Sequence, residues 1–177
     1  MKVSDQYIIP LRGIKDGDYL YSFIADDKFF EQIDESEIKQ GNFKTDVKIE
    51  RRGNLITMRL NISGVVIVPC DRCLDDLNLS FKTNQEIFIK FGETQFNDNQ
   101  DYIFLSDDDD SLNIAQYIYE YIILALPFKR VHSNDIRGTS KCNPEMLKIL
   151  GEYSITNNEN KTDNRWNELK KLKNGTS

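Results

Sequence analysis

The sequence is short of the residues on which most enzymes rely. It has one histidine and three cysteines among 177 residues. No base accompanies a serine or cysteine in a nucleophile signature, and no glycine-rich phosphate-binding motif is present. The acidic run Asp107–Asp110 lacks the interleaved ligands, central glycine and closing glutamate of an EF-hand loop. We therefore predict a protein that is not an enzyme and has no small-molecule substrate.

Long apolar runs are missing as well. No stretch approaches the roughly 20 apolar residues that cross a bilayer. The N-terminal "MKVSDQYIIPLRG" lacks the apolar region of a signal peptide. An odd number of cysteines argues against a disulfide scaffold and for a reducing compartment. We expect a cytoplasmic protein without a membrane partner, long enough to bury a hydrophobic core.

Positive charge is scarce, and the net charge of −6 disfavours bulk electrostatic binding of nucleic acid. The charges are unevenly spread. Residues 86–120 hold nine acidic residues against Lys90, whereas residues 161–173 hold five basic residues against two acidic ones. This asymmetry predicts an interaction surface or a tail with its own partner, unless both stretches are simply solvated faces.

Alternating apolar residues predict an antiparallel β-core. Phe43 to Ile49 and Ile56 to Ile62 alternate on either side of a turn at Arg52–Asn54, which indicates a hairpin with one buried face. Strand patterns also occur in "YIIPL", "DYLYSFI", "DLNLSF", "EIFIKF" and "DYIFL". The segment "DDKFFEQI" is typical of a short helix that begins with acidic residues.

One long helix is expected over Asn113–Leu126, where Asn113 and Gln116 form a capping-box pattern and Pro127 follows the end. We predict an α+β fold in which this helix covers an antiparallel β-sheet that could curl into a partial barrel. A short helix near Pro144–Leu150 follows. Residues 1–153 should form one domain, and residues 154–177 a polar linker and a short, basic helical tail.

Cys70 and Cys73 stand three positions apart between two strand patterns. A redox pair normally places its first thiol at a helix N-terminus, and no helix pattern follows this one. As half of a metal site the pair needs two more ligands. His132 and Cys142 supply them, and three cysteines with one histidine suit one structural, tetrahedral Zn²⁺. Alternatively, the cysteines are small buried residues and His132 is a surface residue. Two features favour this reading: nine residues separate His132 from Cys142, and Leu74 replaces the usual small residue after the second cysteine.

Four segments together resemble the YceD-like family, whose members are associated with accumulation of large-subunit ribosomal RNA. They are "PCDRCLDDL", "SLNIAQYIYEYIILALPFKRVH", "KCNPEML" and "DNRWNELKKLK", within roughly residues 65–173. The matching positions include Cys70, Arg72, Cys73, Leu124, Ala125, Leu126, Pro127, His132, Cys142, Arg165, Trp166, Leu169 and Leu172. The resemblance implies ribosome biogenesis, and it places all three cysteines and the histidine on family motif positions.

We therefore expect a non-catalytic factor that binds large-subunit ribosomal RNA or a ribosomal protein. The candidate contacts to RNA or a protein partner are Arg72, Lys129, Arg130, Arg165, Trp166 and Lys170. Trp166 could instead anchor the tail helix to the domain. The alternatives are a zinc-stabilised protein-interaction module unrelated to the ribosome and a thiol-dependent redox protein.

Overall fold

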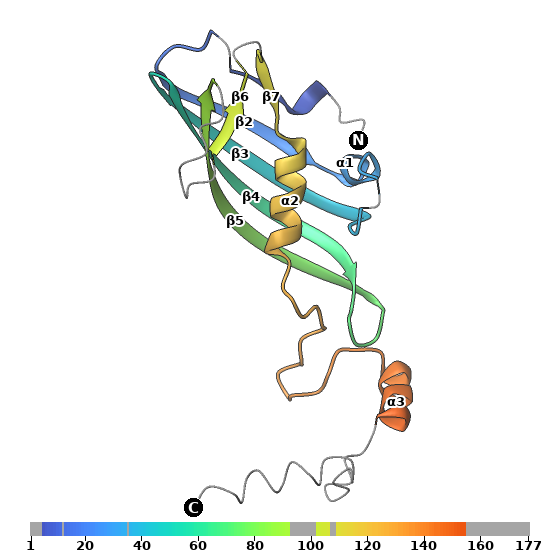
Figure 1. The fold of residues 1–177 in the computed structure, drawn as a ribbon. Coiled ribbons are helices and arrows are strands. Elements are labelled where there is room, and N and C mark those ends of the chain that lie inside the picture. The colour runs from blue at the N-terminus through green and yellow to red at the C-terminus, as the bar shows by residue number, and fades with distance from the viewer. Residues whose placement is uncertain (1–4, 12, 35, 93–101, 107–108, 155–177) are drawn as a thin grey trace, which may run out of the picture. The chain divides into compact units, whose positions relative to one another are not determined.

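The computed structural model describes residues 5–11, 13–34, 36–92, 102–106 and 109–154 (Figure 1). The chain divides into two compact units, Met1–Cys142 and Asn143–Ser177. In its described part, no helix is long and apolar enough to cross a membrane.

The first unit is built on a five-stranded sheet with the order β2-β3-β4-β5-β6. The strands are β2 (Gly17–Ala25), β3 (Gln40–Arg52), β4 (Leu55–Pro69), β5 (Asp76–Phe91) and β6 (Tyr102–Leu105). The first four pair antiparallel, but β6 runs parallel to β5, with Phe88 opposite Tyr102. The sheet is therefore mixed rather than purely antiparallel as we predicted. Its described strands form an open sheet with β2 and β6 at the edges, so the partial barrel is not confirmed.

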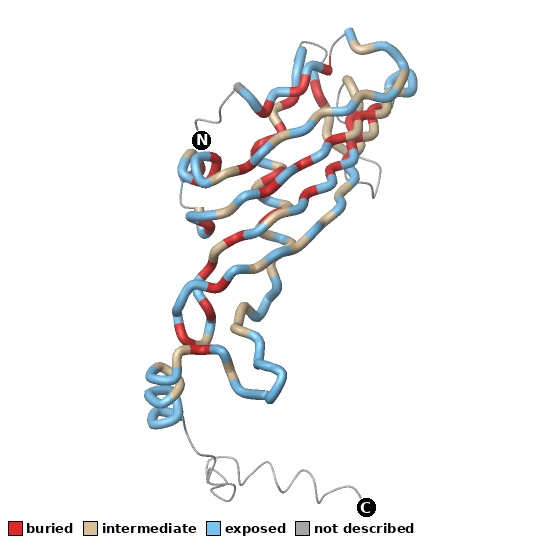
Figure 2. The backbone as a smooth tube through the Cα atoms, turned by 180° about the vertical axis from the view of Figure 1, so that it is seen from behind, coloured by how far each residue is buried: buried red, intermediate tan, exposed pale blue. Residues whose placement is uncertain are grey.

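The predicted hairpin is confirmed in β3 and β4. Ile49 pairs with Met58 across the turn, where Gly53 adopts a φ of 60°. Buried and exposed positions alternate along both strands, as Figure 2 shows. A period of two places every second side chain on the same face, so these apolar residues form the floor of the core.

Helix α2 (Ala115–Ala125) packs against this face of the sheet (Figure 1), with Ala115, Ile118 and Ile122 buried. It is shorter than the helix we predicted, and the capping box does not form. Asn113 accepts a hydrogen bond from the backbone N–H of Ala115, while the Gln116 amide donates to the Glu120 carboxylate. Asn113 instead ends the strand β7 (Ser111–Asn113). Long helical cover of the sheet is therefore not confirmed.

Smaller elements complete the core. The short helices η1 (Asp5–Tyr7) and α1 (Asp27–Glu31) contribute buried aromatic rings, and β1 (Ile8–Pro10) pairs antiparallel with β7 as a separate ribbon. Asp26 caps α1 by accepting from the backbone N–H of Phe29 at 3.1 Å. The acidic start of "DDKFFEQI" thus marks a helix N-terminus, as predicted.

The end of the sheet positions the cysteines. The pairing of β3 with β4 stops at Gln40 opposite Ile67, but β4 and β5 stay paired to Pro69 opposite Asp76. These two strands therefore run beyond the rest of the sheet as a narrow ribbon, whose connection carries Cys70 and Cys73.

In the second unit, α3 (Pro144–Tyr153) confirms the predicted short helix. Asn143 caps it by accepting from the backbone N–H of Glu145 at 3.0 Å. The predicted tail helix and its candidates Arg165, Trp166 and Lys170 lie outside the described residues. The domain boundary that we placed after residue 153 stays a prediction.

Candidate metal centre

The connection between β4 and β5 is a tight turn that holds two thiols. The backbone N–H of Leu74 donates to the carbonyl of Cys70, and the N–H of Cys70 donates to that of Asp75, both at 2.9 Å. Leu74 takes a φ of 63°, a left-handed conformation that glycine adopts more readily. The Leu74 side chain lies in solvent, so the turn forms without it.

The other two predicted ligands flank a small hairpin. One carboxylate oxygen of Asp135 accepts from the backbone N–H groups of Arg137 and Thr139, at 2.9 and 2.7 Å. Asn134 and Ser140 form an antiparallel bridge. The nine residues between His132 and Cys142 therefore fold back on themselves, and the two ligands meet at the open end of the hairpin. The run "SNDIRGTS" carries a turn signal that would have predicted this closure.

Polar contacts join residues 130–142 to the turn that carries Cys70 and Cys73. Two hydrogen bonds link Asp71 and Arg130: the backbone N–H of Asp71 donates to the carbonyl oxygen of Arg130 at 2.7 Å, and the backbone N–H of Arg130 donates to a carboxylate oxygen of Asp71 at 2.6 Å. The Arg130 guanidinium also pairs with this carboxylate at 3.4 Å. Arg72 donates to Ser140 Oγ at 3.1 Å, and the same oxygen accepts from the N–H of Cys142 at 3.2 Å. These contacts hold His132 and Cys142 close to Cys70 and Cys73.

The four ligand atoms form a compact cluster in the first unit. The three sulfurs of Cys70, Cys73 and Cys142 and a ring nitrogen of His132 all lie within 4.8 Å of one another. Cys70 Sγ is 3.9 Å from Cys142 Sγ, and Cys73 Sγ is 3.4 Å from His132 Nδ1. A tetrahedral zinc ion with ordinary bond lengths would separate two sulfurs by about 3.8 Å and a sulfur from a nitrogen by about 3.6 Å. The residues present thus fit a zinc ion.

The histidine is held in a suitable tautomer. His132 Nε2 lies 3.1 Å from the carbonyl oxygen of Asp76, to which it can only donate. This leaves Nδ1, the atom next to the thiols, without a proton when the ring is neutral. The thiols of Cys142 and Cys70 raise the pKa of His132, since their anionic forms favour the imidazolium in the absence of a cation.

The electrostatics of the turn favour thiolates. Burial raises the pKa of the Cys70 thiol, but backbone N–H groups of Cys73, Arg72 and His132 donate to its sulfur and outweigh burial. They bring the pKa of Cys70 from 9.0 down to about 6. A hydrogen bond from Ser140 lowers the pKa of Cys142. Thiolates rather than thiols bind metals, so the lowered pKa values of Cys70 and Cys142 favour binding of a cation.

The other readings of the cysteine pair explain less. None of the three cysteines forms a disulfide, and all three are buried. If the cysteines were only small buried residues, the contact between His132 Nδ1 and Cys73 Sγ at 3.4 Å would have no explanation. The redox interpretation needs a helix N-terminus, and Cys70 and Cys73 lie in a turn between strands.

The remaining candidate residues differ in their surroundings. Lys129 is exposed, whereas Arg72 and Arg130 are half-buried and hold the centre together. Within the acidic stretch, Glu86 pairs with Arg59 at 2.6 Å and Asp109 accepts from the N–H of Ser106. Sequence reasoning missed Asp71, Asp76 and Ser140 as supports of the centre.

The comparisons with known proteins agree with the motifs. No curated protein and no solved structure matches the chain. The family model described as "Large ribosomal RNA subunit accumulation protein YceD" matches residues 58–173. This range includes the ends of β4 and β5, helix α2, the hairpin between His132 and Cys142, and all four clustered ligands. Since this match covers more than half of the 177 residues, the chain belongs to the YceD family.

Proposed function

We propose that this protein is a non-catalytic ribosome biogenesis factor that supports accumulation of large-subunit ribosomal RNA in the cytoplasm, by binding that RNA or a ribosomal protein. The observation that carries the proposal is the family match over residues 58–173. The chemistry of the clustered residues supports the absence of catalysis. Four protein ligands complete a tetrahedral zinc shell, whereas catalytic zinc sites keep one position open for water or substrate.

Cys70, Cys73, His132 and Cys142 would hold one Zn²⁺ as a structural clamp. A zinc ion supplies a cross-link between segments that a short, solvent-exposed loop could not provide by packing. The clamp would fix the loop that leaves α2 to the end of the ribbon. Arg72 and Arg130 would then position this loop, and Lys129 would remain available for a phosphate or an acidic side chain.

The test combines metal analysis with complementation. Purified protein should contain about one zinc per chain by mass spectrometry, and Cys70→Ser should lower both zinc content and thermal stability. In cells depleted of the protein, the wild type should restore the ratio of large- to small-subunit ribosomal RNA, whereas Cys70→Ser should not. Lys82→Ala, on the outer face of β5, is the control that should complement. An unchanged RNA ratio and subunit profile on depletion would refute the function.

One observation favours a second candidate, a zinc-stabilised protein-interaction module unrelated to the ribosome. Phe128 and Ile136, on the loop that the clamp holds, are fully exposed at 106% and 107%. Apolar side chains presented in this way suit a protein interface. Affinity purification separates the candidates, because recovery of large-subunit RNA and proteins supports the first and recovery of one unrelated protein supports the second.

A further inference from the structure

Three neighbouring hollows lie on the first unit, and all three share Gln40 at the start of β3. Only the third borders the clustered ligands, since Asp76, whose carbonyl oxygen lies 3.1 Å from His132 Nε2, is among its lining residues. The first lies between α1 and the segment that leads into β3. The second crosses the outer face of β3, β4 and β5, and the third follows the ends of β4 and β5. Their volumes are about 460, 340 and 360 Å³. We call these three hollows together the Gln40 groove.

The floor of the Gln40 groove is apolar where β4 crosses it. Val65, Ile67 and Pro69 project from the outer face of the sheet, while Val66 and Val68 between them are buried in the core. The run "VVIVP" is therefore apolar on both faces, a pattern typical of strands covered on both sides. Among the described residues nothing covers this outer face, and Val65 is 42% exposed. An apolar strip that the fold leaves open indicates a surface for a partner.

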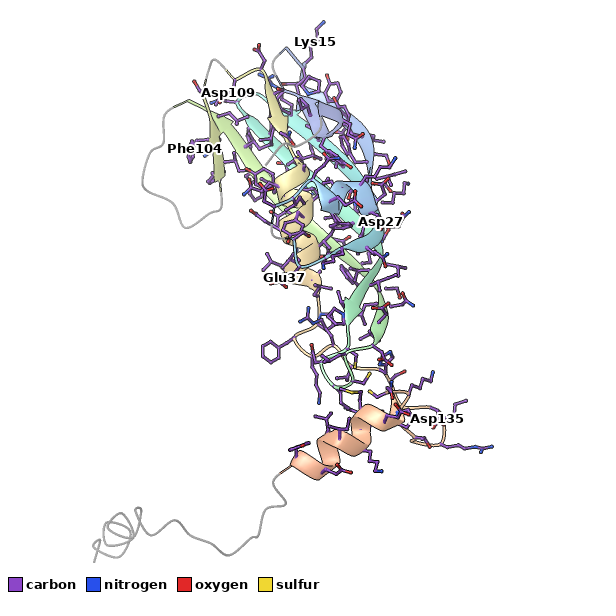
Figure 3. The ribbon with its side chains drawn as sticks, turned by 90° about the vertical axis from the view of Figure 1, so that its right-hand side faces the viewer. Lys15, Asp27, Glu37, Phe104, Asp109 and Asp135 are labelled. Atoms are coloured by element: carbon purple, nitrogen blue, oxygen red, sulfur yellow. The ribbon has the colours of Figure 1, made fainter. Side chains whose placement is uncertain are left out.

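The rim of the groove is acidic. Its described lining residues with negative charge are Asp26, Asp27, Glu31, Glu37 and Asp76, and the lining residue with positive charge is Lys39. Asp27 is held in place because its carboxylate accepts from the backbone N–H of Gly41 at 2.8 Å. Figure 3 labels Asp27 and Glu37. This charge repels the phosphates of nucleic acid and complements lysine and arginine.

We propose that the Gln40 groove binds an extended segment of a partner protein that carries lysine or arginine between apolar residues. In an extended segment, alternate side chains face opposite sides, so apolar residues can contact Val65 and Ile67 while the basic ones between them reach Asp27 and Glu37, which line the same hollows. The inference rests on the groove alone and does not require a ribosomal function.

The probe is a fluorescein-labelled peptide of alternating lysine and valine, titrated with the full-length protein and followed by fluorescence anisotropy. We expect saturable binding and little binding of a glutamate–valine peptide. Glu37→Lys should weaken binding about fivefold, since one favourable contact of about 1 kcal/mol is lost. Its control is Glu152→Lys, which makes the same charge change on α3 and should bind as the wild type does.

A second matched pair tests the apolar floor. Ile67→Thr should weaken binding about fivefold or more because it removes apolar contact area. Ile24→Thr makes the same change at an exposed position of β2, outside the groove, and should have no effect. Circular dichroism and thermal melting establish that each variant is folded.

Several results would overturn the proposal. They are failure of the wild type to bind the lysine–valine peptide, equal binding of the glutamate–valine peptide, and equal losses in the variants and their controls. A dimer that Ile67→Thr dissociates would identify a second copy as the occupant. Tighter peptide binding after replacement of Lys170, Lys171 and Lys173 by glutamate would identify the chain's own basic residues, rather than a partner protein, as the occupant of the groove.

Discussion

A methyl group added at Gly64 should weaken the part of the sheet from which the ribbon projects. Gly64 pairs with Phe43 on β3. A Cβ at Gly64 would lie 2.6 Å from Phe43 Cα and 2.7 Å from Phe43 Cδ1, and it would also overlap the carbonyl oxygen of Asn42. Carbon atoms in contact prefer about 3.5–4.0 Å. Two of these three obstacles are backbone atoms of the paired strand, so no change of rotamer can relieve the overlap.

The strands must therefore separate by about 1 Å at this pair. Phe43 is buried and its ring packs against Phe81 at a centroid distance of 5.1 Å, so the shift disturbs the core as well. Overpacking of cores costs about 1–3 kcal/mol, and the upper end applies because the obstacle is backbone. Alanine in place of glycine returns about 0.4–1 kcal/mol through the unfolded state. We expect Gly64→Ala to lower the free energy of unfolding by about 2 kcal/mol.

Urea unfolding followed by circular dichroism measures this change, and the melting temperature should fall by about 4–8 °C. Gly151→Ala is the control, because its Cβ would meet nothing within 4 Å and lies in helix α3. It should be neutral or stabilising. A loss below about 0.5 kcal/mol for Gly64→Ala would show that β3 and β4 adjust freely, which contradicts the close approach described above.

Three further predictions concern the ligand cluster and the core. Arg72→Met removes the bond to Ser140 and should lower zinc affinity about 10–100-fold in competition with a chelating dye; unchanged affinity would mean that Arg72 supports nothing at the centre. In the metal-free protein, the pKa of Cys70 falls from 9.0 to about 6, so its contribution to stability is present above pH 9 and is lost as pH falls through 6. The raised pKa of His132 acts in the opposite direction, because the contribution of His132 to folding stability is lost as pH rises through that pKa. We expect melting temperatures of the metal-free protein to rise from pH 7 to pH 9, and a flat profile would argue against the lowered pKa of Cys70. Thr45→Val should stabilise the fold by about 1 kcal/mol in urea unfolding, because in the described structure Thr45 Oγ1 is buried without a hydrogen-bond partner; destabilisation would reveal an unseen partner.

Local patterns predicted the central hairpin well because the buried face repeats along both strands. Phe43 to Ile49 and Ile56 to Ile62 alternate without interruption, and the turn between them contains a glycine with positive φ. The parallel pairing of β6 could not be predicted in this way. "YIFL" has the same composition whichever direction its neighbour runs, and its pairing with β5 depends on a tertiary contact rather than on local sequence.

The candidate metal centre shows a similar division. Residue type identified the four clustered ligands, since thiols and an imidazole are the groups that zinc prefers. The supports around them depend on tertiary contact. The carbonyl oxygen of Asp76 belongs to the backbone and has no signature in sequence, and Ser140 is one serine among several until Arg72 reaches it.

The hairpin between His132 and Cys142 has a consequence for how such centres evolve and are recognised. Its Asp135 turn and the Asn134–Ser140 bridge close it without help from the ligands. The Asn134–Ser140 bridge lies between the ligands and the tip, where Ile136 is exposed, so we expect the two ligands to keep their places when residues are added at the tip. A search that demands a fixed gap between the third and fourth ligands would overlook relatives with longer or shorter tips. We therefore expect a reporter peptide inserted at the tip to leave the zinc content of the protein unchanged.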